Sequence, residues 1–150
     1  MKGRLGMLLT TAVVVGALLA ITAPLAFATT WDITKPFGSL LGHVAKTNST
    51  SFSITNKAGD VVGKVIKTGS GGWKVVRGSK RIATVKADGN AKYPANLYDL
   101  KGTRIGRCKR SSGTWELGRI NNIFLEIRAL APRDCPARAA LGATRLLNWK

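Results

Sequence analysis

Two stretches of this chain read as copies of one another, and this duplication constrains the fold more than any other feature of the sequence. In both copies an Asn or Asp is followed three residues later by Gly, and a Ser-Gly-x-Trp run comes after the next apolar segment. The matched segments are 56–65 with 99–108, at an offset of 43 residues (99 − 56), and 70–77 with 112–119, at an offset of 42 (112 − 70). A unit of this length cannot bury its own apolar face, so we expect the two copies to share one core.

Each copy is predicted to form four short β-strands, because runs of β-branched residues alternate with glycine or polar turns. Asn56-Lys-Ala-Gly59 and Asp99-Leu-Lys-Gly102 suit type I turns that close hairpins with a glycine bulge, since Gly accepts positive φ without a Cβ clash. We therefore expect an all-β fold, a barrel-like domain of about eight antiparallel strands from two tandem four-strand repeats. The runs of the first copy lie at 52–56, 61–67, 73–77 and 81–87, and the copies span about 54–96 and 97–129.

The segments on either side of the repeats have a different pattern. Residues 29–51 form a polar lead-in or linker, in which the spacing of apolar residues predicts a short helical turn. The β-repeat domain extends over 52–150 and ends in a helix at about 135–149. Asp134 is expected to cap this helix and Pro136 to occupy an early position. Its wide apolar stripe favours packing across a sheet or over the mouth of the barrel.

The first 28 residues carry the features of a secretory signal peptide. A basic start precedes an almost wholly apolar run at 5–23, and Ala26-Phe-Ala28 fits cleavage by signal peptidase. We expect secretion and a mature chain that begins at Thr29 and has no membrane span; the alternative is a protein anchored in the membrane by residues 5–23. The chain has 24 Lys and Arg against 7 Asp and Glu, so loss of Lys2 and Arg4 leaves a net charge of +15 (24 − 2 − 7).

Two cysteines occur, Cys108 and Cys135, and both lie in the expected mature chain. In an exported protein an even pair favours a disulfide over a metal site or a reactive thiol. We therefore predict a Cys108–Cys135 disulfide, with two buried free thiols as the alternative.

Catalytic constellations are not recognisable in the sequence. His43 is the one histidine and has no Cys, Ser or acid at a recognisable spacing, so we expect it to be a solvated linker residue, and we expect no metal site and no cofactor. Glu116 and Glu126 both lie on predicted strands, and a small secreted hydrolase or toxin that uses this pair is the alternative function. Their counterparts in the first copy are Lys74 and Thr84, so the acidic pair is not repeated.

Positive charge is what the two copies repeat. Lys64 matches Arg107, and Arg77 matches Arg119. The two matched arginines, Arg77 and Arg119, each lie four residues after a matched tryptophan. The tryptophans, Trp73 and Trp115, are expected to fill the core. Arginine holds phosphate or carboxylate groups with paired hydrogen bonds, and a high net charge attracts anionic partners. The sequence thus predicts a monomeric, non-catalytic binding module for phospholipid headgroups, acidic cell-wall polymers or extracellular nucleic acid, with Lys64, Arg77, Arg107 and Arg119 as its anion-binding residues.

The hairpins 56–63 and 99–106, followed by the apolar segment 137–149, resemble those of the tubby-like family, which includes the LURP-one-related proteins and the phospholipid scramblases. The resemblance implies a non-enzymatic barrel with a C-terminal helix. In some members of the family such a barrel binds phosphoinositides or membranes. No binding residue is carried over from the family to this chain.

Overall fold

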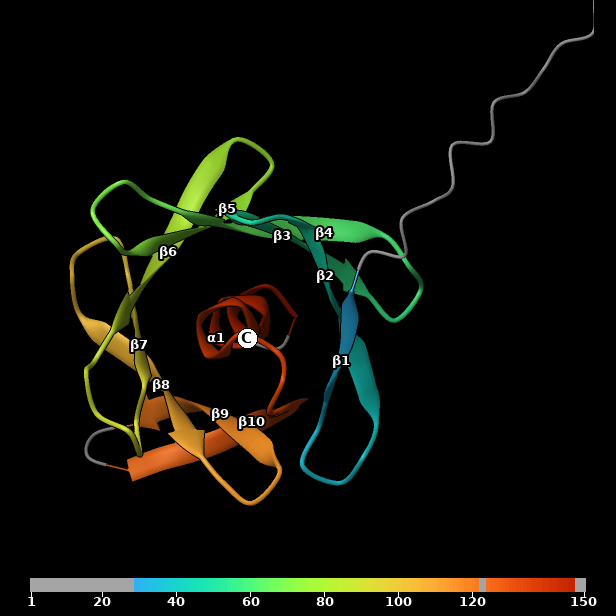
Figure 1. The fold of residues 1–150 in the computed structure, drawn as a ribbon, viewed down its shortest axis with the longest axis vertical. Helices are drawn as coiled ribbons and strands as arrows, with labels where there is room; N and C mark the ends of the chain where they lie inside the picture. The colour runs from blue at the N-terminus through green and yellow to red at the C-terminus, as the bar shows by residue number, and fades with distance from the viewer. Residues whose placement is uncertain (1–28, 122–123, 148–150) are drawn as a thin grey trace, which may run out of the picture.

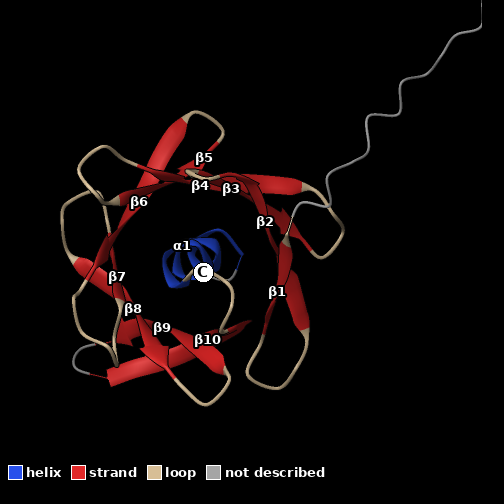
Figure 2. Cartoon of the chain, viewed as in Figure 1, coloured by secondary structure: helices blue, strands red, loops and turns tan. Residues whose placement is uncertain are grey.

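The computed structural model describes residues 29–121 and 124–147, which fold into a closed antiparallel β-barrel around one helix. Figure 1 looks down the barrel and shows α1 (Ala137–Leu147) on its axis, and Figure 2 shows that strands make up the whole wall. The strands are β1 (Thr30–Thr34), β2 (Leu40–Asn48), β3 (Ser51–Asn56), β4 (Val61–Lys67), β5 (Trp73–Arg77), β6 (Lys80–Ala87), β7 (Ala95–Tyr98), β8 (Arg104–Arg110), β9 (Thr114–Asn121) and β10 (Phe124–Pro132).

The all-β barrel with a C-terminal helix is confirmed, but the predicted number of eight strands is wrong. The additional strands, β1 and β2, come from the segment 29–51 that was expected to be a linker with a helical turn. Trp31 and Ile33 alternate with polar residues and point inward, as does Val44, so this segment has the period of a strand rather than that of a helix. β1 also pairs with β10, which closes the barrel.

Each strand pairs with the next along the chain, so the remaining connections are hairpins or short loops. The predicted turn chemistry is confirmed: Gly59 and Gly102 have φ of +92° and +83°, and the amide of each donates to the carbonyl oxygen three residues earlier. Arg77 pairs with Lys80 across the predicted two-residue loop. The grouping of β3–β6 and β7–β10 into two duplicated units remains a prediction from the sequence.

The up-and-down order places five of these connections at one end of the barrel, which we call the hairpin rim. Its described part comprises residues 35–39, 57–60, 78–79 and 99–103 and the adjoining strand ends, including the end of β9 and the start of β10. α1 begins at the opposite end and ends toward the rim. Leu146 packs near Gly63 at the start of β4, and Leu147 packs near Gly42 at the start of β2.

The helix lies inside the barrel, whereas the sequence favoured a position across a sheet or over the mouth. It contacts all ten strands, and residues 139–144 are buried on every side. The central residues 139–143 are apolar on every side of the helix, and such a segment requires an enclosure of this kind. Small residues, Ala139, Ala140, Gly142 and Ala143, allow the wall to close around it.

Asp134 does not cap the helix, contrary to the prediction. The helix begins at Ala137, three residues later, and the Asp134 carboxylate accepts a hydrogen bond from the indole nitrogen of Trp31 at 3.1 Å. This bond ties the entrance of the helix to β1. Trp115 makes a similar tie, because its indole nitrogen donates to the Cys135 carbonyl oxygen at 2.8 Å.

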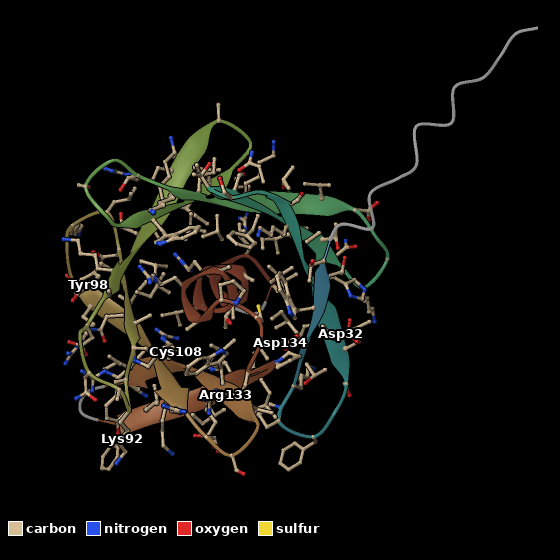
Figure 3. All side chains as sticks on the ribbon, in the orientation of Figure 1. Asp32, Lys92, Tyr98, Cys108, Arg133 and Asp134 are labelled. Atoms are coloured by element: carbon tan, nitrogen blue, oxygen red, sulfur yellow. The ribbon has the colours of Figure 1, made fainter. Side chains whose placement is uncertain are left out.

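The predicted Cys108–Cys135 disulfide is absent, and both cysteines are buried free thiols. Cys108 points inward from β8, as Figure 3 shows, and Cys135 lies in the loop that leads into α1. A buried thiol packs as a small apolar group. Burial raises the pKa of both thiols to about 12, so the thiolate that disulfide exchange requires is strongly disfavoured.

We expect both thiols to resist alkylation in the folded protein at pH 8, because neither is accessible or ionised. Mass spectrometry after iodoacetamide treatment should show no added group under native conditions and two in denaturant without reductant. An unreduced, denatured protein that takes up no label would instead carry the disulfide.

Candidate anion-binding surface

Three neighbouring strands form a surface with positive charge and no carboxylate. From Val61 to Ala87 the chain contains seven basic residues and no Asp or Glu. They lie on β4, β5, β6 and the β5–β6 hairpin, and among the described residues none of them takes part in an ion pair. We call these three strands and the β5–β6 hairpin the basic wall; its cations are Lys64, Lys67, Lys74, Arg77, Lys80, Arg81 and Lys86.

The basic wall is hollowed between β5, β6 and the loop that precedes β5. The hollow has a volume of about 780 Å³. Three of its lining residues are basic and three carry hydroxyl groups: Lys74, Arg81 and Lys86, and Thr68, Ser70 and Thr84. Cations and hydroxyl donors together suit the oxygen atoms of a phosphate or carboxylate group.

The strand register explains why these side chains meet. Lys74 lies directly opposite Thr84 across β5 and β6, and Thr84 lies opposite Tyr98 on β7. Trp73 and Val75 point into the core from the same strand as Lys74, so Lys74 must point outward. A bulge between Val75 and Val76 shifts the register beyond this row.

A second hollow of about 250 Å³ continues the first toward the hairpin rim. It shares Arg81, Thr84 and Lys86 with the first hollow and adds Tyr98 and Asp99. The carboxylate oxygen Oδ1 of Asp99 accepts the backbone amides of its own turn at 2.8 and 2.9 Å, so this acid serves the turn.

An aromatic ring borders the hollows on the β7 side. Figure 3 shows Tyr98 on the outer side of the wall, and the Lys86 ammonium lies 5.4 Å from the centre of its ring. At this distance the Tyr98 ring attracts the Lys86 ammonium by a cation–π interaction, which does not neutralise the charge of Lys86.

Two of the four predicted residues, Lys64 and Arg77, belong to the basic wall. They line a separate hollow of about 400 Å³ on β4 and β5, together with the apolar side chains of Val61, Ile66 and Val76. Both are exposed. The structure therefore brings this predicted pair together, at the rim end of the wall.

The other predicted pair, Arg107 and Arg119, lies on β8 and β9, away from the basic wall. Arg107 is occupied: its Nε donates to Asn96 Oδ1 at 3.0 Å, Asp88 Oδ2 lies 3.5 Å from its Nη2, and its guanidinium lies 4.4 Å from the centre of the Tyr93 ring. The four predicted residues thus form two separate pairs rather than one site.

Arg77 and Arg119 both lie near the last turn of α1. Burial lowers the pKa of Arg145 in that turn, and the positive charges of Arg77 and Arg119 lower it further, while Asp99 acts in the opposite direction. Arg77 and Arg119 therefore lie at the same end of the barrel, the rim end, although they belong to different strands, β5 and β9. Positive charge extends over this end of the helix.

The two glutamates of the alternative enzymatic function bind different cations. Glu116 Oε2 lies 2.8 Å from Lys109 Nζ, and this hydrogen bond lowers the pKa of the Glu116 carboxyl. Glu126 Oε2 lies 3.0 Å from Arg128 Nη2. In register Glu126 lies opposite Arg119, and Glu116 opposite Leu130, so the two acids are not cross-strand neighbours.

Histidine and tryptophan positions also differ in part from expectation. His43 lies on β2 rather than in a linker, and its Nδ1 is 2.8 Å from Asp32 Oδ1 on β1. The predicted core position is confirmed for Trp73, which is buried and whose ring centre lies 5.5 Å from that of Phe52. Trp115 is only half-buried and packs against the core.

Among the described residues, no group of three or more His, Cys, Asp and Glu is placed to hold a metal ion, and no helix is long and apolar enough to cross a membrane. Comparison with protein-family models, characterised proteins and solved structures finds no match to this chain.

Sequence reasoning missed Lys74, Arg81 and Thr84, although a signal for them existed. Lys74 and Thr84 are the counterparts of Glu116 and Glu126, and pairing the predicted strands at 73–77 and 81–87 across the Gly78-Ser79 loop places them close together on the outer face. The pattern of charge repeated in both copies does not include Lys74 and Thr84, because the second copy has glutamates at the matching positions.

Proposed function

We propose that this protein is a secreted, non-catalytic binding module for anionic ligands and that the basic wall is its binding surface. The observation that carries the proposal is the run of seven cations from Val61 to Ala87 without a carboxylate, over a hollow lined by Lys74, Arg81 and Lys86. Phospholipid headgroups, acidic cell-wall polymers and extracellular nucleic acid share the closely spaced anionic groups that such a surface attracts.

The proposal revises the set of binding residues expected from the sequence. Lys64 and Arg77 remain part of the surface because they lie on the same wall and are exposed. Arg119 adds charge at the rim. Arg107 contributes less, because its guanidinium is already held by Asn96, Asp88 and Tyr93.

Replacing the three basic residues of the large hollow tests the proposal. We expect the variant Lys74→Gln, Arg81→Gln, Lys86→Gln to bind inorganic polyphosphate about tenfold more weakly than the unmodified protein, because it loses three charged donors from one site. Binding of the unmodified protein should weaken steeply as salt rises, since exposed charges are screened beyond about 8 Å at physiological ionic strength. Isothermal titration calorimetry at several salt concentrations measures both effects.

The matched control carries the same loss of charge elsewhere. Lys46, Lys92 and Arg110 are exposed and lie on β2, in the β6–β7 loop and on β8. Their replacement by Gln should reduce affinity by less than about threefold, as expected for screened surface charge alone. Equal losses in the two variants would show that the charge is diffuse, and no binding by the unmodified protein at low salt would refute the function.

A further inference from the structure

The exposed large hydrophobic side chains of the described residues all lie at the hairpin rim. Phe37 is fully exposed in the β1–β2 hairpin, and Phe124 is 72% exposed at the start of β10. The full set is Phe37, Leu40, Val61, Leu100 and Phe124. Single exposed apolar residues are ordinary on protein surfaces, but their confinement to one end of the barrel indicates an interaction surface.

These side chains follow one another around the barrel. In the order of strands around the barrel, the β1–β2 hairpin is followed on one side by the β3–β4 hairpin and on the other by β10, whose first residue is Phe124, and the β7–β8 hairpin comes after β9. Four adjacent hairpins therefore carry the exposed apolar residues. The remaining hairpin, β5–β6, carries Arg77, Lys80 and Arg81, and is the rim end of the basic wall.

The rim also carries an excess of positive charge between and beside the apolar tips. Its cations are Lys35, Lys57, Arg77, Lys80, Lys101, Arg104 and Arg119. Two acids of the rim, Asp60 and Asp99, accept hydrogen bonds from Asn56 and from backbone amides of their own hairpins. Apolar tips beside cations are the combination that binds the interface of an anionic bilayer.

The opposite end of the barrel lacks this combination among the described residues. Its loops, 49–50, 68–72, 88–94 and 111–113, contain polar residues and glycine, and none of the exposed large hydrophobics lies in them. Of the aromatic side chains near that end, Trp31 and Trp73 are buried, and Tyr93 and Trp115 are half-buried. The asymmetry gives the domain one end suited to a membrane surface and one suited to water.

We propose that the hairpin rim docks onto an anionic phospholipid bilayer, with Phe37 and Phe124 entering the interface and the β5–β6 hairpin in contact with the headgroups. This rests on the proposed function in one respect, since the charge of the basic wall and rim draws the protein to the bilayer. A second copy of the chain is a poorer occupant, because rim-to-rim contact would bring like charges together.

Vesicle binding by rim variants tests the docking. The N-terminal residue of each purified protein is determined by mass spectrometry. All variants compared should begin at the same residue. Phe37→Ser, Phe124→Ser should reduce partition onto vesicles of phosphatidylglycerol and phosphatidylcholine by about tenfold or more, because two exposed rings no longer enter the interface. The thermal melt should not change, and vesicles of phosphatidylcholine alone should bind the unmodified protein weakly.

Two control proteins make the result specific. Adding Ser49→Phe and Ser112→Phe at the opposite end should not restore binding to the doubly substituted protein, although it restores the number of exposed rings. The variant Lys74→Gln, Arg81→Gln, Lys86→Gln should lose affinity for soluble polyphosphate, whereas the Phe37, Phe124 variant should keep it. Restoration by the new rings would mean nonspecific adhesion and would refute a rim-specific contact.

The outcomes separate this inference from the proposed function. Unchanged vesicle binding by the Phe37, Phe124 variant would overturn the docking while leaving polyphosphate binding by the wall intact. Docking would also be wrong if sedimentation showed a dimer that the two Ser substitutions dissociate and if vesicles did not bind. If the unmodified protein does not bind polyphosphate, the basic wall is not a polyanion site, even if the protein still binds vesicles through the rim.

Discussion

Removal of α1 is expected to abolish the folded barrel. A chain that ends at Cys135 lacks Leu141 and Leu146, each of which lies in the core and contributes about 2–5 kcal/mol by comparison with Leu→Ala substitutions. The inner side chains of the wall would also face a water-filled channel. Since single domains are stable by only about 5–15 kcal/mol, the remaining strands cannot compensate.

Circular dichroism and a thermal melt of the shortened chain measure this effect. We expect no cooperative transition, and near-ultraviolet signals of the buried tryptophans should disappear. A control chain that ends at Leu147 keeps α1 whole and should melt as the full chain does. A shortened protein with a cooperative melt and native aromatic signals would show that the barrel has a core of its own.

The second large effect is expected from Gly142→Ala, which should destabilise the protein although alanine favours helices. In an exposed helix the change would stabilise by about 1 kcal/mol. Here an added Cβ would lie 2.7 Å from Val65 Cγ2 and 3.2 Å from Val75 Cγ2. Overpacking of this kind costs about 1–3 kcal/mol, so the free energy of unfolding should fall.

Urea unfolding of a small set of variants tests the cause. Val65→Ala combined with Gly142→Ala should be more stable than the sum of the single effects, because the smaller side chain makes room for the new methyl group. Gly69→Ala is the control, because its added Cβ would meet nothing within 4 Å. A stabilised Gly142→Ala protein would show that the helix fits the barrel loosely.

The sequence predicted the strands of the repeat well because their signals are local. Phe52 and Ile54 alternate with polar residues, and Asn56 and Gly59 supply turn chemistry that needs no distant partner. The lead-in was misread because Gly42 appeared to weaken any regular structure. Glycine is needed at position 42 because of a tertiary contact. An added Cβ there would lie 2.8 Å from Cδ2 of Leu147, a residue near the other end of the chain.

The basic character of the surface was predictable, but its organisation was not. Lys64 and Arg77 were found because their charge recurs in the second copy, whereas Lys74 and Arg81 have no such counterpart signal and meet only through the β5–β6 register and its bulge. The apolar surface of the hairpin rim could not be predicted from the sequence either, because it too depends on how the strands are arranged. Phe37 and Phe124 are far apart in sequence and come to the same end of the barrel only through the up-and-down strand order and the pairing of β1 with β10.

Nuclear magnetic resonance titration of the ¹⁵N-labelled protein with inorganic polyphosphate tests the central claim most directly, because it locates the bound anion without any substitution. We predict that the largest chemical-shift changes fall on the amides of Lys74, Thr84 and Lys86, with little change at Lys46 and Arg110. Changes spread evenly over all basic segments, or centred on β8 and β9, would contradict the account.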